Sequence, residues 1–118
     1  MTSMPVLETE RLIIRPLEPG DLDTIHSILD VELADADFGS ESAKALDGRR
    51  EWLTWTILSY EQLARLHQPP YGERAVSLKS SGELIGAVGY VPCLTVFGQL
   101  PSFGGQRDGL ATTEFGLY

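Results

Sequence analysis

The clearest alternation of apolar and polar positions lies in residues 73–92 and predicts a β-hairpin. Val76 and Leu78 share one face of its first strand. The turn at residues 80–83 contains Gly82, which can adopt the positive φ that a tight turn requires. This hairpin is the element around which we expect the rest of the chain to pack.

Apolar residues occupy both faces of the second strand, residues 84–91. Such a strand is typical of the centre of a sheet with both faces covered, and we expect that position here. Gly86 and Gly89 interrupt it, although glycine weakens a buried strand. The two glycines indicate either a close approach by a helix or a ligand backbone, or a bulge.

A first strand is predicted over residues 7–16, after a frayed N-terminus of residues 1–6. Leu12 and Ile14 alternate with Ile13 and Arg15 along it. Pro16 should end this strand, because proline has no N–H to donate to a neighbouring strand.

Two further stretches repeat apolar residues at helical spacing. The first helix begins near Asp21, a candidate cap or first-turn carboxylate. Its apolar stripe comprises Leu22, Ile25 and Leu29. His26 flanks this stripe, and we interpret it as a partly buried helix residue rather than a ligand, because nothing near it in the sequence completes a site.

The second helix is predicted over residues 49–67, after Gly48. Its apolar stripe comprises Leu53, Ile57, Tyr60 and Ala64. Residues 31–46, between the helices, are acidic and aperiodic, which favours a solvated connection over a metal site.

The sequence after the hairpin predicts a mobile loop over residues 94–110, of the kind that often carries function. Residues 104–109 are glycine-rich but lack the Gly-Lys-Ser/Thr ending of a phosphate-binding loop, so we reject that interpretation. A strand is predicted over residues 111–118.

Composition narrows the functional classes. The 118 residues, 42% of them hydrophobic, suffice for one domain, residues 1–118. A net charge of −8 argues against nucleic-acid binding, and solubility explains it most simply. Cys93 is the only cysteine, which excludes an internal disulfide and a multi-cysteine zinc site, and we expect no metal. Because the sequence has no long apolar run and no signal pattern, we expect a cytoplasmic protein with no membrane contact.

The order strand, helix, helix and three strands predicts an α+β fold with helices packed on a mostly antiparallel sheet. Three segments carry a family resemblance: LETERLIIRPL at residues 7–17, GELIGAVGY at 82–90 and TEFGLY at 113–118. In this order they resemble the first strand, the following hairpin and the fourth strand of GNAT-superfamily N-acetyltransferases. The resemblance is strongest to the branch that includes the ribosomal-protein alanine acetyltransferases.

This resemblance implies direct transfer of an acetyl group from acetyl-CoA, as co-substrate, to a primary amine of a small molecule or a protein N-terminus. Glu114 matches the fourth-strand glutamate that serves as the base in some members, and a solvent-exposed strand-end Glu is the equally weighted alternative. Trp52 and Trp55 match, by position only, the region that shapes the acceptor pocket. Tyr118 matches the start of the segment that pairs with pantetheine.

The resemblance ends before the family's Gln/Arg-x-x-Gly-x-Gly/Ala loop, which holds the acetyl-CoA pyrophosphate at a helix N-terminus. We therefore expect a truncated GNAT-like domain whose 118 residues lack activity by themselves. Two alternatives remain open: a non-catalytic binding or assembly module that uses an open sheet edge, and a small-ligand protein with a Trp-lined groove. The strand at residues 111–118 would expose one edge, which predicts a homodimer formed through that strand.

Overall fold

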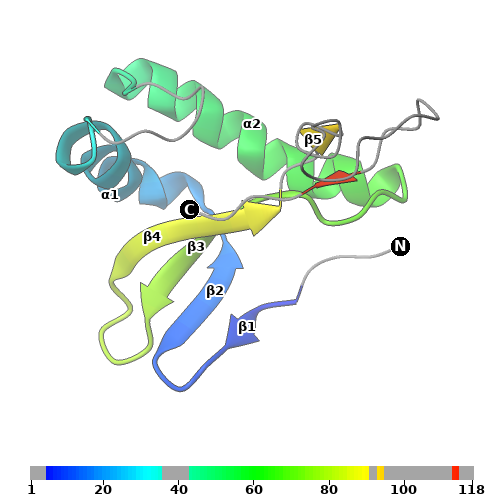
Figure 1. Ribbon diagram of the computed structural model, residues 1–118, viewed down its shortest axis with the longest axis horizontal. Helices are drawn as coiled ribbons and strands as arrows, with labels where there is room; N and C mark the ends of the chain where they lie inside the picture. Colours follow the sequence, from blue (N-terminus) through cyan, green and yellow to red (C-terminus); the bar gives the residue numbers. More distant parts are fainter. Residues whose placement is uncertain (1–4, 36–42, 91–92, 95–112, 115–118) are drawn as a thin grey trace, which may run out of the picture.

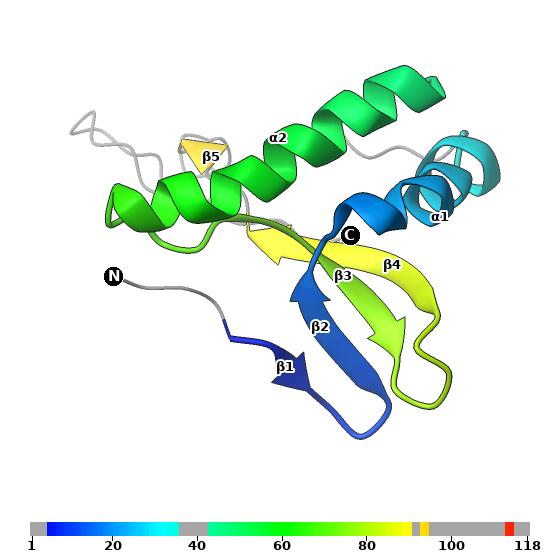
Figure 2. The ribbon, with the colours of Figure 1, turned by 180° about the vertical axis from the view of Figure 1, so that it is seen from behind.

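The computed structural model describes residues 5–35, 43–90, 93–94 and 113–114. Four antiparallel strands form one sheet in the order β1-β2-β3-β4. These strands are β1 (Leu7–Glu8), β2 (Leu12–Pro16), β3 (Gly72–Leu78) and β4 (Leu84–Tyr90). Helices α1 (Leu22–His26) and α2 (Leu46–Arg65) lie over one face of the sheet (Figures 1 and 2). The predicted α+β architecture, with helices packed on an antiparallel sheet, is confirmed.

The prediction of one strand over residues 7–16 is wrong, because the chain forms two short strands joined by a turn. The hydroxyl oxygen of Thr9 accepts hydrogen bonds from the backbone N–H groups of Arg11 and Leu12, at 3.3 and 3.0 Å. These side-chain contacts stabilise a turn where the apolar pattern suggested an uninterrupted strand. β1 then pairs with β2, which ends at Pro16 as predicted.

The first helix is preceded by a 3₁₀ turn, Pro19–Asp21. The Asp21 carboxylate accepts the backbone N–H of Glu18 at 2.8 Å. It also binds both terminal nitrogens of Arg15, at 2.9 and 3.0 Å. Asp21 therefore supports the start of the helix, as the sequence predicted, and ties that start to β2.

A π-helical segment, Ser27–Glu32, continues α1 beyond the predicted stripe. The backbone N–H of Leu33 donates to the carbonyl of Ile28 at 3.0 Å, which is the i→i+5 spacing of a π-helix. Two successive residues of this segment, Leu29 and Asp30, are buried. The expected solvated connection therefore begins later than predicted, and residues 36–42 of it lie outside the described residues.

Helix α2 begins at Leu46 rather than Arg49, so Gly48 lies in its first turn. Leu53 of the predicted stripe is 2% exposed. The buried apolar core between helices and sheet comprises Leu17, Ile25, Leu29, Leu53, Ala75, Leu84 and Ala87. The partly buried residues packed against this core are Leu22, Ile28, Trp52 and Ile57.

Tyr60 attaches the second half of α2 to the sheet. Its hydroxyl accepts the backbone N–H of Leu17 at 3.1 Å and donates to the carbonyl of Glu73. The buried guanidinium of Arg74 lies over the Tyr60 ring, with Cζ 4.1 Å from the ring centroid. One aromatic side chain thus contacts β3 and the segment that follows β2.

The predicted hairpin is confirmed as β3 and β4, with Gly82 in the turn at a φ of +75°. Val76 pairs with Gly86, but the next residue, Ser77, pairs with Leu84. Ile85 is therefore the extra residue of a β-bulge. The bulge explains the irregularity that Gly86 suggested.

Gly89 is explained by a close approach of the neighbouring strand rather than of a helix. A Cβ atom at Gly89 would lie 2.4 Å from the carbonyl oxygen of Gly72 on β3. Among the described residues, a Cβ atom at Gly86 would meet nothing within 4 Å. The expectation of close contact by a helix is thus wrong at both positions in the described part of the chain, and close contact by a ligand stays a prediction.

Within the described residues, β4 is an edge strand and not the predicted central one. A separate pair of short strands joins β5 (Cys93–Leu94) to β6 (Thr113–Glu114). Leu94, predicted to start the mobile loop, thus lies in a strand. The rest of that predicted loop, and the rest of the predicted strand at 111–118, lie outside the described residues.

The two glycines of β4 give a matched stability test. Gly89→Ala should lower the free energy of unfolding by at least about 2 kcal/mol, because the added methyl group overlaps backbone that cannot move aside cheaply. Gly86→Ala adds the same group in open space and should change that free energy by less than about 1 kcal/mol. Urea unfolding of both variants checks this, and equal losses would contradict the proposed close approach.

Candidate functional site

One buried carboxylate, Asp30, joins the π-helical segment to α2. It accepts two hydrogen bonds from Arg49, from Nε and Nη2, each at 2.8 Å. The backbone N–H of Lys44 donates to it at 2.8 Å, and Nδ1 of His26 lies 2.9 Å from its second oxygen. The side chains of Asp30 and Arg49 are only 1% and 5% exposed, so this is a buried, bidentate ion pair.

The surroundings of Asp30 favour its charged form. Burial raises the pKa of Asp30, but the hydrogen bonds from Arg49, Lys44 and His26 outweigh burial and lower the pKa to about 2. Asp30 is therefore a permanent anion at neutral pH. Such a carboxylate fixes its neighbours and does not exchange protons with a substrate.

Arg49 extends this cluster to Trp52, since its Cζ atom lies 4.8 Å from the Trp52 ring centroid. Trp52 and Trp55 line the same open hollow, of about 540 Å³, at the beginning of α2. The residues of this tryptophan hollow are Lys44, Ala45, Gly48, Glu51, Trp52 and Trp55. Trp52 is partly buried against the core, whereas Trp55 is 69% exposed.

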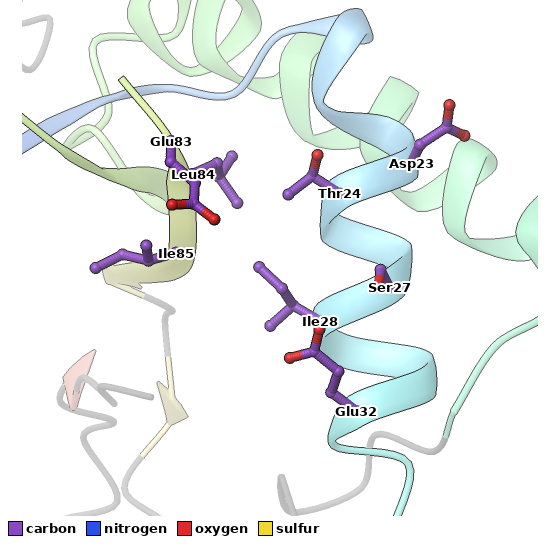
Figure 3. Close-up of a pocket in the computed structure, with 8 residues that line it drawn as sticks. All are labelled: Asp23, Thr24, Ser27, Ile28, Glu32, Glu83, Leu84 and Ile85. Atoms are coloured by element: carbon purple, nitrogen blue, oxygen red, sulfur yellow. The ribbon is translucent and has the colours of Figure 1, made fainter. Parts of the chain in front are cut away.

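A second hollow, of about 440 Å³, lies between the first helix and the start of β4 (Figure 3). Its lining residues are Asp23, Thr24, Ser27, Ile28, Glu32, Glu83, Leu84 and Ile85. Figure 3 shows the carboxylates of Glu32 and Glu83 turned toward the space between the elements, and Asp23 turned away from it. The lining contains three carboxylates and no basic residue, so this polar hollow favours a cationic group electrostatically.

Of the site residues predicted from the sequence, the structure describes Trp52, Trp55 and Glu114 but not Tyr118. Trp52 and Trp55 lie together on one hollow, but their role as acceptor-binding residues stays a prediction. Glu114 lies in β6, where its backbone pairs with Cys93, and its role as a base also stays a prediction. Tyr118 lies outside the described residues. His26 is partly buried, as predicted, but it contacts Asp30, a partner that the sequence reasoning did not consider.

Sequence reasoning missed Asp30 and Arg49. A signal for both was present, because Asp30 directly follows Leu29 of the first apolar stripe and Arg49 precedes Leu53 of the second by four residues. An acid and a base beside two buried stripes predict a pair wherever the two helices pack together.

Among the described residues, no group of three or more His, Cys, Asp or Glu side chains could hold a metal ion. None of the helices in those ranges is long and apolar enough to cross a bilayer.

Comparison with solved structures identifies the fold. A putative GNAT-family acetyltransferase from Bordetella pertussis matches with a TM-score of 0.60 over 98% of this chain, at 17% sequence identity. Apo FdhC, described as a nucleotide-linked sugar GNAT, matches with a TM-score of 0.51 over 74% of this chain, at 16% identity. This chain has the GNAT fold.

The chain spans 58% of the length of the Bordetella GNAT structure and 44% of that of apo FdhC. No protein-family profile and no curated protein matches the sequence. The two structural matches therefore identify the GNAT architecture, while the acceptor, the co-substrate and the branch remain matters of proposal.

The Asp30–Arg49 pair should make stability depend on pH in a specific window. Asp30→Asn leaves Arg49 buried without its anion and should cost about 3 kcal/mol at pH 7. The folded-state pKa of about 2 lies below the ordinary value of 3.8. The stabilisation by Asp30 is thus complete above about pH 5 and is lost as the pH falls through about 2.

The difference in unfolding free energy between the native chain and Asp30→Asn should accordingly be large at pH 7 and shrink toward pH 2. Urea unfolding followed by circular dichroism at several pH values measures it. Asp47→Asn is the control, because Asp47 pairs with Arg50 on the exposed surface and such pairs contribute little. A difference for Asp30→Asn that stays constant from pH 7 to pH 2 would contradict the assignment.

Proposed function

We propose that this chain is the acetyl-transferring unit of a GNAT-type enzyme, of the branch that resembles ribosomal-protein alanine acetyltransferases, which acetylates a primary amine. The observation that carries the proposal is the fold match to a GNAT structure over 98% of the chain. In this chain, α1 and α2 lie over an antiparallel sheet of order β1-β2-β3-β4, and the TM-score of 0.60 indicates the same overall fold in the Bordetella structure. A fold supports many functions, so the chemistry must be argued from residues.

In the proposed reaction, the acceptor nitrogen attacks the thioester carbonyl of acetyl-CoA, a C–N bond forms and the C–S bond breaks, and the CoA thiolate leaves and takes a proton. The amine must be neutral to attack, so a base has to remove its proton. Glu114 is the candidate base, by its match to the fourth-strand glutamate of the family. Acetyl-CoA is a co-substrate here, and the thioester supplies the acetyl group.

The tryptophan hollow is the candidate acceptor site. The indole faces of Trp52 and Trp55 offer large apolar contact area, and Glu51 places a carboxylate on the same lining. The lining carries one carboxylate, Glu51, and one ammonium group, Lys44, so the aromatic faces are the main attraction for an organic cation, which is how a protonated amine arrives before it loses its proton. Trp55, with most of its surface exposed, has the most area to offer an incoming acceptor.

Steady-state assays of acetyl transfer by the full-length protein test the proposal, with acetyl-CoA and a panel of primary amines and peptides. Glu114→Gln should lower kcat at pH 7 by about 10²-fold, because a general base is lost. Trp55→Ala should raise the acceptor KM more than it lowers kcat. The control is Glu61→Gln, whose side chain is 67% exposed and pairs only with Arg65 among the described residues. Native turnover that Glu114→Gln leaves unchanged would exclude Glu114 as the base.

A binding or assembly module is the second candidate function, and the edge position of β4 favours it. In the described sheet, β4 presents one unpaired edge, and Ile85 on this strand is 43% exposed. An open edge with apolar side chains recruits another strand. A homodimer through the C-terminal strand, or through this edge, belongs to this proposal.

Sedimentation at micromolar concentration tests whether the chain assembles into a dimer through the edge of β4. The native chain should sediment as a dimer, and Ile85→Lys should convert it to a monomer, because an edge lysine blocks strand pairing. Leu7→Lys is the matched control, since Leu7 is 44% exposed and lies on β1, at the opposite edge of the sheet. A native monomer would count against the assembly module.

A further inference from the structure

The lining of the tryptophan hollow comes from the segment directly before α2 and from the first turns of α2, and we call these its two walls. Asp30 binds Lys44 of the first wall directly and reaches Trp52 of the second through Arg49. One wall is the segment before α2, where the backbone N–H of Lys44 donates to Asp30. The other wall is the first turns of α2, where Arg49 binds Asp30 and lies against the ring of Trp52. Asp30 itself is not part of the lining.

We propose that Asp30 is a positioning residue for acceptor binding, which acts by setting the separation and orientation of the two walls of the tryptophan hollow. The proposal rests on the proposed function only in assigning the acceptor to this hollow. The hydrogen bonds that hold the walls are properties of the chain itself, and they can be tested without any acceptor.

The contacts form a closed loop. Asp30 accepts the backbone N–H of Lys44. The carbonyl of the next residue, Ala45, accepts the backbone N–H of Arg49 at 2.9 Å. The side chain of Arg49 then donates to Asp30, which closes the loop. Arg49 uses two donors on two oxygens, which fixes the plane of its guanidinium group. Because that group lies against the Trp52 ring, the ring has restricted freedom to rotate into the hollow.

The π-helical segment supplies the position from which Asp30 acts. Asp30 is buried beside Leu29, and this places a carboxylate at the boundary between the core and the loop that leads to α2. A π-helical turn is often found at functional positions. Here it orients a single side chain inward, toward the start of α2 and the residues that directly precede it.

If Asp30 had a purely structural role, it would only hold the first helix against α2. A second ion pair of the same helix, Asp21–Arg15, serves as the comparison for that role. Asp21 binds Arg15 through two oxygens, just as Asp30 binds Arg49, and it joins the start of the same helix to β2. Neither Asp21 nor Arg15 lines the tryptophan hollow. Asp21→Asn therefore weakens the packing of the first helix without touching either wall.

The first measurement needs no ligand. The chain contains two tryptophans, so Trp55→Phe leaves Trp52 as the single fluorescent reporter. In that background, Asp30→Asn should raise the acrylamide quenching constant of Trp52 by about twofold or more, because the ring is released from Arg49. Hydrogen exchange of the Lys44 amide should accelerate by about tenfold or more, because its acceptor has lost its charge. Asp21→Asn should leave both values at those of the parent.

A second variant guards against loss of folding. Arg49→Lys keeps the positive charge but cannot form the two-pronged contact, so it should also raise Trp52 quenching while the chain stays folded. Folding of each variant is checked by circular dichroism at the temperature of the quenching experiment. If folded Asp30→Asn or Arg49→Lys gives the same quenching and exchange as Asp21→Asn, the positioning role is wrong.

The second measurement addresses the acceptor, with benzylamine as the probe. In the full-length protein with Trp55 retained, Asp30→Asn should raise the Kd or KM for benzylamine by about tenfold while kcat falls less, since the hollow and not the chemistry is altered. Native protein that neither binds nor acetylates any amine would overturn the proposed function, whereas the quenching and exchange results would still decide whether Asp30 positions the hollow.

Discussion

The buried pair of Asp30 and Arg49 is the interaction on which the helical layer depends. Two charges removed from water stabilise a fold only when their hydrogen-bonding capacity is satisfied, because desolvation otherwise exceeds their attraction. Here the carboxylate accepts two bonds from Arg49, one backbone bond from Lys44 and a contact from His26. Few arrangements of the first helix and α2 meet all of these requirements together. The pair therefore specifies one packing of the two helices, where apolar side chains would tolerate several.

The same specificity explains the irregular course of the first helix. Leu29 must face the core, and Asp30, its neighbour, must reach Arg49 and the segment before α2. A regular helix turns successive side chains away from each other by about 100°. The π-helical segment, Ser27–Glu32, is the place where both residues are accommodated, since both are buried there. A departure from ideal geometry thus coincides with the polar contact that joins the helices.

The sequence predicts those parts of the fold in which periodicity and burial agree. α2, β3, β4 and the turn at Gly82 follow from apolar spacing and turn chemistry. The break between β1 and β2 does not, because the Thr9 hydroxyl competes with strand pairing over a few residues. The reason for a glycine at position 89 becomes clear only from the pairing of β3 with β4, which brings the backbone of Gly72 close to it. The Asp30–Arg49 pair was missed because hydrophobic periodicity assigns every charged residue to the surface.

The two tryptophans show that a sequence pattern can predict the region of a site without predicting the surroundings of each residue in it. Both were expected in one region, and both line one hollow, yet their surroundings differ. Trp52 packs against the core and carries Arg49 on its ring, so its position is determined by the fold. Trp55 is largely exposed, which leaves a large apolar surface in water with no contribution to the core. If the hollow takes the proposed acceptor, covering Trp55 would supply most of the binding energy and the fixed ring of Trp52 would supply selectivity. The two tryptophans therefore differ in what holds them, since among the described contacts Arg49, bound by Asp30, lies on the ring of Trp52 and not on that of Trp55.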